Sequence, residues 1–238
     1  MDNPFIGMTA NEVRDRFLGL NNVQELASFL SITSKQLGYF SSEGIKEKHY
    51  VSFKLRKKRG GFRTIEAPSD ALKTIQRKLA FTISEIYHPL SCVSGFVSKR
   101  GLRYGASKHE HRKKLVNFDL ENFFPSIPQN KVFGVFAQYF NLPIAVSDVL
   151  AKLVCLHHCL TQGSPTSPCL SNIILHKLDS QMLRIAKRTG TTYTRYVDDI
   201  TFSSRGNMPK VIWHHDDISN ELKQIINAAG FRVNSEKT

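Results

Sequence analysis

Three aspartates stand where strand-like segments of this sequence end. Asp119 follows the short apolar run 115–118, and Asp198 and Asp199 lie at the tip of an expected β-hairpin 79 residues further along. Mg²⁺ prefers carboxylate oxygens, and a pair of such ions can activate a hydroxyl nucleophile and neutralise a leaving pyrophosphate. The carboxylates therefore predict a phosphoryl-transfer site with two Mg²⁺ ions. Asp-Asp pairs are also common in solvated turns, and Asp216-Asp217 is another such pair.

The chain as a whole is strongly basic. Its 238 residues include 33 Lys and Arg against 20 Asp and Glu, which gives a formal net charge of +13. Of all residues, 41% are apolar. This balance favours a polyanionic partner, and the apolar content is sufficient for a core, which excludes a disordered chain. Residues 54–63 hold six basic residues and no acid, and residues 99–114 hold seven and one acid. We expect these two stretches to contact nucleic acid.

Apolar periodicity predicts the elements that must position the aspartates. Short helices should fill residues 1–48, where Thr9 and Glu12 form a capping box, and a hairpin with strands 49–55 and 62–67 and turn 57–61 should follow. A long helix should start at Ser69 and stop before Pro89. The other expected elements are helices at 129–140, 144–158, 167–189 and 216–229, a strand at 115–118, a hairpin at 191–204 and a short strand at 231–234.

No targeting or membrane signal is visible. No apolar run approaches the roughly 18 residues that span a bilayer, and no basic flank leads into an apolar stretch at the N-terminus. We expect a cytoplasmic protein with reduced cysteines. The run Cys155-Leu156-His157-His158-Cys159 carries metal-ligand types, but its Cys-x-x-x-Cys spacing is not a usual zinc pattern, so we expect no zinc there. The run His214-His215-Asp216-Asp217 is expected to cap the following helix.

Four blocks of sequence resemble the motifs of reverse transcriptases. Tyr196-Val197-Asp198-Asp199 resembles their Tyr-x-Asp-Asp signature. Residues 117–127, Asn-Phe-Asp-Leu-Glu-Asn-Phe-Phe-Pro-Ser-Ile, are similar to the first catalytic motif of bacterial members. Residues 162–168 resemble the Gln-Gly-x-x-x-Ser-Pro block between these two, and residues 230–238 resemble the block that follows. The four blocks stand in the family's order.

Two of these details resemble retron reverse transcriptases in particular. They are the Asp-Leu-x-x-Phe-Phe-x-Ser-Ile wording after residue 118, and the run 105–109, which matches the Ala and His of the retron Asn-Ala-x-x-His element but has Gly105 in place of Asn. The resemblance covers about residues 50–238 and implies an α+β fold with the fingers and palm of a right-hand polymerase. It also implies an antiparallel palm sheet that is backed by helices. We expect an N-terminal helical extension at 1–48, fingers at 49–115 and palm at 116–238, with the thumb absent from this chain.

The resemblance assigns roles to single residues. Asp119, Asp198 and Asp199 match the metal ligands, helped by the backbone carbonyl of Leu120. Phe124 matches a bulky gate under the sugar of the incoming nucleotide, where a ring excludes the 2′-hydroxyl of ribonucleotides. The alternative is that Phe124 belongs to the core.

Further residues match contacts to the nucleotide and the nucleic acid. Arg63 matches the arginine over the incoming nucleotide, although basic hairpin tips are often simply solvated, and Gln162 and Gly163 match contacts beside the nucleotide and template base. The triphosphate contact falls on Arg56, Lys57 or Lys58, a choice that stays open. Lys237 matches a lysine proposed to protonate the leaving pyrophosphate. The expected nucleic-acid contacts are Lys99, Arg100, Arg103, Lys108, His109 and Tyr196, with a helix cap as the alternative for His109.

The resemblance implies an RNA-directed DNA polymerase. Such an enzyme extends a hydroxyl primer on a structured RNA template with deoxynucleoside triphosphates and leaves an RNA-DNA hybrid. The retron type implies a branched RNA-DNA product and antiphage defence with an effector protein. One alternative is another bacterial reverse transcriptase, of the group II intron or defence-associated type. The other is an RNA-binding scaffold, against which the three close carboxylates argue, since like charges repel.

Overall fold

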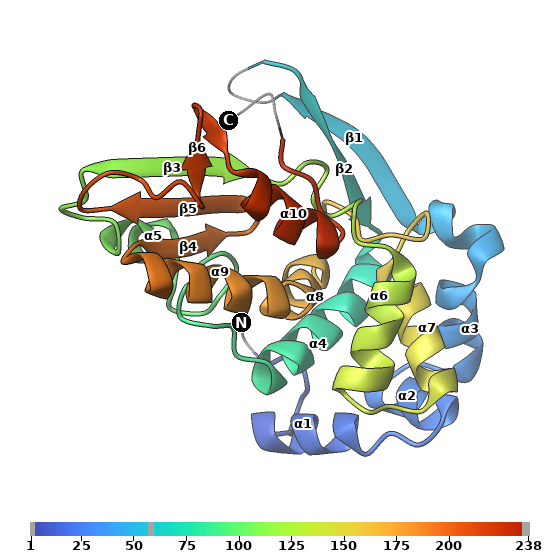
Figure 1. Cartoon of the computed structure of the whole chain (residues 1–238). Coiled ribbons are helices and arrows are strands. Elements are labelled where there is room, and N and C mark those ends of the chain that lie inside the picture. Colours follow the sequence, from blue (N-terminus) through green and yellow to red (C-terminus); the bar gives the residue numbers. More distant parts are fainter. Residues whose placement is uncertain (1–2, 57–59, 235–238) are drawn as a thin grey trace. The chain divides into compact units, whose positions relative to one another are not determined.

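The computed structural model describes residues 3–56 and 60–234, which divide into two compact units. One unit combines residues 3–56, 60–88 and 127–171, and the other combines residues 89–126 with 172–234 (Figure 1). Each unit is therefore built from two separate stretches of chain. The fingers and palm boundaries at 49 and 116 are functional divisions, and they stay a prediction.

The first unit is mainly helical. Its helices are α1 (Ala10–Leu18), α2 (Val23–Leu30), α3 (Ser34–Ser41), the 3-10 helix η1 (Glu43–His49), α4 (Asp70–Ile86), α6 (Gln129–Gly134), the π-helical η2 (Val135–Tyr139) and α7 (Ile144–Val154). The predicted capping box is confirmed, because the Thr9 side chain accepts from the Glu12 amide and the Glu12 carboxylate accepts from the Thr9 amide. Aromatic rings fill the core, where Phe17 packs on Phe29 and Phe140.

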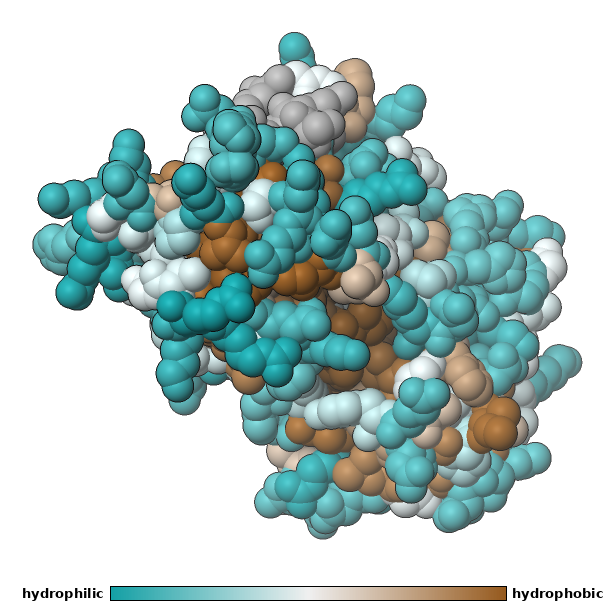
Figure 2. Space-filling model, viewed as in Figure 1, coloured by the Kyte–Doolittle hydropathy of each residue, from teal (hydrophilic) through white to brown (hydrophobic). Residues whose placement is uncertain are grey.

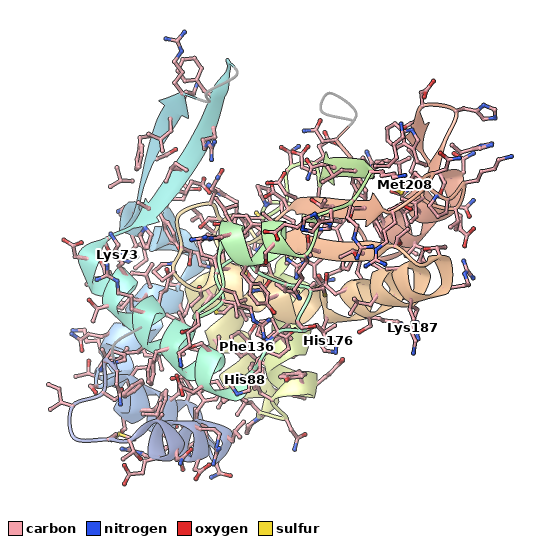
Figure 3. The ribbon with its side chains drawn as sticks, turned by 90° about the vertical axis from the view of Figure 1, so that its left-hand side faces the viewer. Lys73, His88, Phe136, His176, Lys187 and Met208 are labelled. Carbon is pink, nitrogen blue, oxygen red and sulfur yellow. The ribbon has the colours of Figure 1, made fainter. Side chains whose placement is uncertain are left out.

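A two-stranded hairpin extends from the helices of this unit (Figures 1 and 3). Its strands β1 (Tyr50–Arg56) and β2 (Phe62–Pro68) pair antiparallel, with Tyr50 opposite Pro68 and Arg56 opposite Phe62. The predicted hairpin is thereby confirmed. Every β1 residue after Tyr50 is exposed, so β1 has water on both faces, whereas β2 becomes buried toward Pro68.

The second unit is built on a three-stranded antiparallel sheet with the order β3-β5-β4. The strands are β3 (Lys114–Asp119), β4 (Thr192–Tyr196) and β5 (Asp199–Ser204), which confirms the expected strand and hairpin. The helix α9 (His176–Thr189) packs against β4 (Figure 1), and the labels of His176 and Lys187 mark its two ends in Figure 3. Gly190 ends α9 with a left-handed φ of +65°.

Smaller elements complete this unit. They are α5 (Leu102–Ser107), the short hairpin β6 (Trp213–His214) and β7 (Asp217–Ile218), and α10 (Asn220–Ala228). The chain thus combines helices with small antiparallel sheets, and the expected α+β class is confirmed.

Two predicted helices are longer than the observed ones, because a two-residue turn stands where one end of each helix was expected. His215 and Asp216 have φ of +51° and +59° and form the tip of the β6–β7 hairpin, so this run does not cap α10, which Ser219 caps instead. His157 and His158 have φ of +48° and +57° between the bridged Leu156 and Cys159, so α7 ends at Val154 and not at residue 158.

Two more predicted helices are interrupted. The helix expected at 167–189 divides at Leu175 into α8 (Ser167–Ile174) and α9. The helix expected at 129–140 changes to a π-helix at Val135, because the amide of Phe140 donates to the carbonyl of Val135.

No helix in the described part of the chain is long and apolar enough to cross a membrane. Hydrophilic residues cover most of the face seen in Figure 2.

Candidate active site

The sheet of the second unit brings the three predicted metal ligands to one end. Asp119 ends β3 and stands directly opposite Asp199, the first residue of β5. The amide of Leu120 donates to the carbonyl of Asp198 over 3.2 Å, which joins the strand end to the hairpin tip. Asp119 is buried, Asp198 half-buried and Asp199 exposed, so the group lies at the margin between core and solvent.

The segment after α10 supports Asp119 from the other side. Asn234 donates its backbone amide to the Asp119 carbonyl at 2.9 Å and its side-chain amide to Asp119 Oδ2 at 3.3 Å. Val233 and Leu120 form a bridge, so the strand expected at 231–234 is a single bridge here. Asn234 is a functional candidate that the sequence reasoning missed, although its block was singled out.

These oxygen donors suit a hard divalent cation such as Mg²⁺. Within residues 3–56 and 60–234, however, no group of three or more His, Cys, Asp or Glu side chains is arranged as a ready metal site. The backbone thus brings the three carboxylates to one strand end, while metal binding by Asp119, Asp198, Asp199 and the Leu120 carbonyl stays a prediction.

Phe124 lies shortly after Asp119 in the sequence and in the same unit as the three aspartates. It is half-buried, and its ring centroid lies 5.0 Å from that of Phe123. Phe123 is itself buried and packs on Phe231 at 5.9 Å. The two neighbouring rings therefore differ, since Phe123 belongs to the core while Phe124 keeps an open side, as a gate requires.

The predicted Gln162-Gly163 contact lies in the first unit, where it is fastened to the hairpin. The amide of Glu66 on β2 donates to the Gln162 carbonyl at 2.9 Å. Gly163 has a φ of +139°, and a Cβ added there would lie 2.6 Å from the Glu66 carbonyl oxygen. Only glycine fits this contact, so the packing of the loop on β2 requires Gly163 whether or not the residue also has its predicted role.

A buried polar network holds the same loop from below. The Gln76 side chain, fully buried on α4, accepts from Ser164 Oγ at 2.8 Å and donates to the Tyr50 hydroxyl and the Leu153 carbonyl, both at 2.9 Å. Ser164 and Thr166 hydroxyls lie 2.9 Å apart. Gln76 therefore links α4, α7 and the base of β1 to the Gln-Gly loop, a role that its place in a helical pattern did not indicate.

Basic residues predicted on the hairpin have mixed outcomes. Arg63 is exposed on β2 opposite Leu55, and Arg56 is exposed at the end of β1. Lys57, Lys58 and Lys237 lie outside the described residues. The described arginines are thus available to a ligand, and their roles stay predictions.

The second basic stretch divides into exposed and engaged residues. Lys99 and Arg103 are exposed. Arg100 Nη1 instead donates to the carbonyls of Pro89, Leu90 and Val93 at 3.1, 2.8 and 3.1 Å, and Lys108 Nζ donates to the Ser91 carbonyl. These contacts give Arg100 and Lys108 a role in holding the loop before α5, beside the predicted one in nucleic-acid binding.

His109 joins two strands of the β3-β5-β4 sheet. Its Nδ1 lies 2.6 Å from Ser203 Oγ on β5 and its Nε2 lies 2.7 Å from Thr194 Oγ1 on β4. Burial, with help from the charges of Arg112 and Lys108, lowers its pKa. Both ring nitrogens are thus engaged with strand hydroxyls, and neither caps a helix. Tyr196, by contrast, is half-buried opposite Asp199, beside the three aspartates.

Comparison with known proteins gives the same answer as the motifs. Residues 55–238 match the sequence model of the family described as Reverse transcriptase (RNA-dependent DNA polymerase). The chain is 36% identical over 235 residues to the Retron Ec86 reverse transcriptase of Escherichia coli, covering 96% of this chain and 70% of that protein. The chain therefore belongs to the reverse transcriptase family, and within it to the retron type.

Two relatives from Myxococcus xanthus are similar at comparable identity. The Retron Mx65 reverse transcriptase is 34% identical over 243 residues and the Retron Mx162 reverse transcriptase 32% over 244 residues. These alignments cover 90% and 92% of this chain but only 54% and 50% of the relatives. The chain thus spans about half the length of these two curated proteins.

Proposed function

We propose that this chain is an RNA-directed DNA polymerase of the retron type. The observation that carries the proposal is the placement of Asp119 opposite Asp199, with Asp198 joined to Leu120, at one end of an antiparallel sheet. Two of the motifs that resemble reverse transcriptases, around Asp119 and at residues 196–199, lie at the ends of these strands. A strand end of this kind holds carboxylates on a rigid frame, as phosphoryl transfer requires.

Asp119, Asp198 and Asp199 would hold two Mg²⁺ ions with the Leu120 carbonyl. Bound there, the ions would lower the pKa of the primer hydroxyl and neutralise the charge that develops on the triphosphate. Phe124 would lie under the sugar, and its open side would meet a 2′-hydroxyl and exclude ribonucleotides.

The exposed guanidinium of Arg63 would stack on the incoming nucleotide or bind its phosphates. One of Arg56, Lys57 or Lys58 would add a triphosphate contact, and Lys237 would donate a proton to the leaving pyrophosphate. Lys99 and Arg103 would bind the phosphates of a structured RNA or RNA-DNA hybrid.

We extend the proposal to the biological product. The chain would act in the cytoplasm and, as its resemblance to the retron type implies, would start from a 2′-hydroxyl of a folded RNA and give a branched RNA-DNA molecule. That product would serve antiphage defence with an effector protein.

Primer extension by the purified 238-residue chain tests the reaction class. The reaction contains a primed RNA template, Mg²⁺ and either deoxynucleoside or ribonucleoside triphosphates. We expect extension with deoxynucleotides and little with ribonucleotides. Tight RNA binding without extension would instead favour the scaffold, and equal use of both sugars would refute the gate.

A further inference from the structure

The turn that carries the aspartates is strained at Val197. This residue forms the tip of the β4–β5 hairpin with a φ of +59°, in the left-handed region. That region crowds Cβ against the backbone, and a β-branched side chain makes the crowding worse. Such a conformation persists only where the surroundings enforce it. The next two residues are Asp198 and Asp199, so whatever enforces the turn also places the carboxylates.

The first restraint on the turn is Arg195, a fully buried side chain two residues before the tip. Its Nη1 donates to the Val197 carbonyl at 2.8 Å. Its Nε and Nη2 donate to the two carboxylate oxygens of Asp179 on α9, at 2.8 and 2.7 Å. The turn is thus connected through one planar guanidinium to the helix that packs against the sheet.

The ion pair is itself closely held. The hydroxyl of Tyr193 donates to Asp179 Oδ1 at 2.7 Å, and both members of the pair are fully buried. Burial disfavours the charge on Arg195, but the Asp179 carboxylate outweighs burial and raises the pKa of the guanidinium. Because bidentate contacts fix the plane of the guanidinium, Nη1 has little freedom to leave the Val197 carbonyl.

The second restraint is steric and comes from Gly95. A Cβ added to Gly95 would lie 2.5 Å from the Val197 amide nitrogen and 2.8 Å from Val197 Cγ2. The Asn172 side chain connects the two restraints, since it donates to the Gly95 carbonyl at 3.3 Å and accepts from Arg195 Nη2 at 3.1 Å. Val197 is therefore packed against the backbone of Gly95 and held by the hydrogen bond from the Arg195 guanidinium to its carbonyl.

We propose that Arg195, Asp179 and Gly95 form a positioning device that holds the strained Val197 turn and thereby places Asp198 and Asp199 for metal binding. This inference rests on the proposed function. It goes beyond it because it assigns three residues outside the catalytic motifs to the geometry of the site. Arg195 and Asp179 act through the turn and touch no reacting atom.

The experiment measures Mn²⁺ binding by the free-ion electron paramagnetic resonance signal, with Mn²⁺ as the probe in place of Mg²⁺. The main variant combines Arg195→Met, Asp179→Leu and Tyr193→Phe, which removes the pair without leaving a lone charge or hydroxyl buried. The matched control is Arg188→Met with Glu221→Leu, which removes an exposed pair, 3.4 Å apart, between α9, the helix of Asp179, and α10. Cooperative thermal unfolding confirms that each variant folds.

We expect the main variant to bind Mn²⁺ about tenfold more weakly than the wild-type chain, equivalent to about 1.4 kcal/mol. The control should bind as the wild type does. Adding Val197→Asn to the main variant should restore most of the affinity, because Asn tolerates the left-handed conformation without support. A folded main variant with wild-type affinity, or a loss that Val197→Asn does not restore, would overturn the proposal.

If the main variant does not fold, Gly95→Ala decides the question. The substitution leaves the ion pair in place, but its Cβ must displace the backbone of Val197, so binding should again weaken about tenfold. Unchanged binding would refute the device. The double variant Asp198→Asn with Asp199→Asn separates the two claims, because wild-type binding in that variant would refute the metal site of the proposed function itself.

Discussion

Gly163→Ala should release the Gln-Gly loop from the hairpin. At a φ of +139° an L-residue is strained, at a cost of about 1–3 kcal/mol. Its Cβ would also lie 2.6 Å from the Glu66 carbonyl oxygen, which is backbone and cannot swing aside. Moving β2 away would break the bond from the Glu66 amide to the Gln162 carbonyl, worth about 1 kcal/mol. The expected loss of unfolding free energy is about 2–4 kcal/mol.

Urea unfolding and amide hydrogen exchange at Glu66 measure this loss. The matched control is Gly190→Ala, where φ is +65° and nothing lies within 4 Å of the added Cβ, so that only the conformational cost of about 1–2 kcal/mol applies. The Glu66 amide should exchange faster in Gly163→Ala and unchanged in the control. If both variants lose equal stability and Glu66 keeps its protection, the contact that we assign to Gly163 is wrong.

Three further predictions concern single side chains. Phe124→Ala should raise ribonucleotide incorporation relative to deoxynucleotides by about tenfold or more, and unchanged sugar discrimination in single-nucleotide extension would remove Phe124 from the gate. Because the pKa of His109 is lowered in the folded state, a proton binds this side chain more readily in the unfolded chain. The free energy of unfolding should therefore be highest above the ordinary pKa of 6.5 and should fall as the pH decreases below it. His109→Gln should flatten that loss in urea titrations at several pH values, and an unchanged slope would contradict it. Gln76→Leu should cost about 1–3 kcal/mol because the Ser164 hydroxyl, the Tyr50 hydroxyl and the Leu153 carbonyl each lose a hydrogen bond, whereas the exposed Gln24→Leu should cost little.

Local patterns predicted the strand ends that carry the aspartates. Strands are predicted by the apolar run before Asp119 and by the alternating residues on either side of Val197. The two strands that flank Val197 are so close in sequence that they can only be joined as a hairpin. Where strained or unusual backbone decides the structure, the patterns failed. His157 and His158 adopt left-handed conformations that no Gly or Asn announces, and Leu175 interrupts a helix without a Gly or Pro.

The spacing of residues in the sequence could not predict contacts between distant segments. Arg195 is a charged residue within a buried strand, and Asp179 occupies an apolar position of α9 next to Leu178. Each is a detectable irregularity, but their pairing depends on how α9 packs on β4. Arg100 is a second such case, since its guanidinium donates to three carbonyls of its own unit, a contact that its place in a basic stretch did not indicate. Its contact with nucleic acid stays a prediction.

The most direct test of the central claim is the rate of deoxynucleotide addition on a primed RNA template in Mg²⁺. Asp198→Asn with Asp199→Asn should reduce it on the order of 10³-fold or more, about 4 kcal/mol of transition-state stabilisation. The chain offers a matched control in Asp216→Asn with Asp217→Asn, the same change in the last turn residue and the first β7 residue of the β6–β7 hairpin. That control should retain the wild-type rate. Equal rates for all three proteins, or equal losses in both double variants, would contradict the assignment of the polymerase site to Asp198 and Asp199.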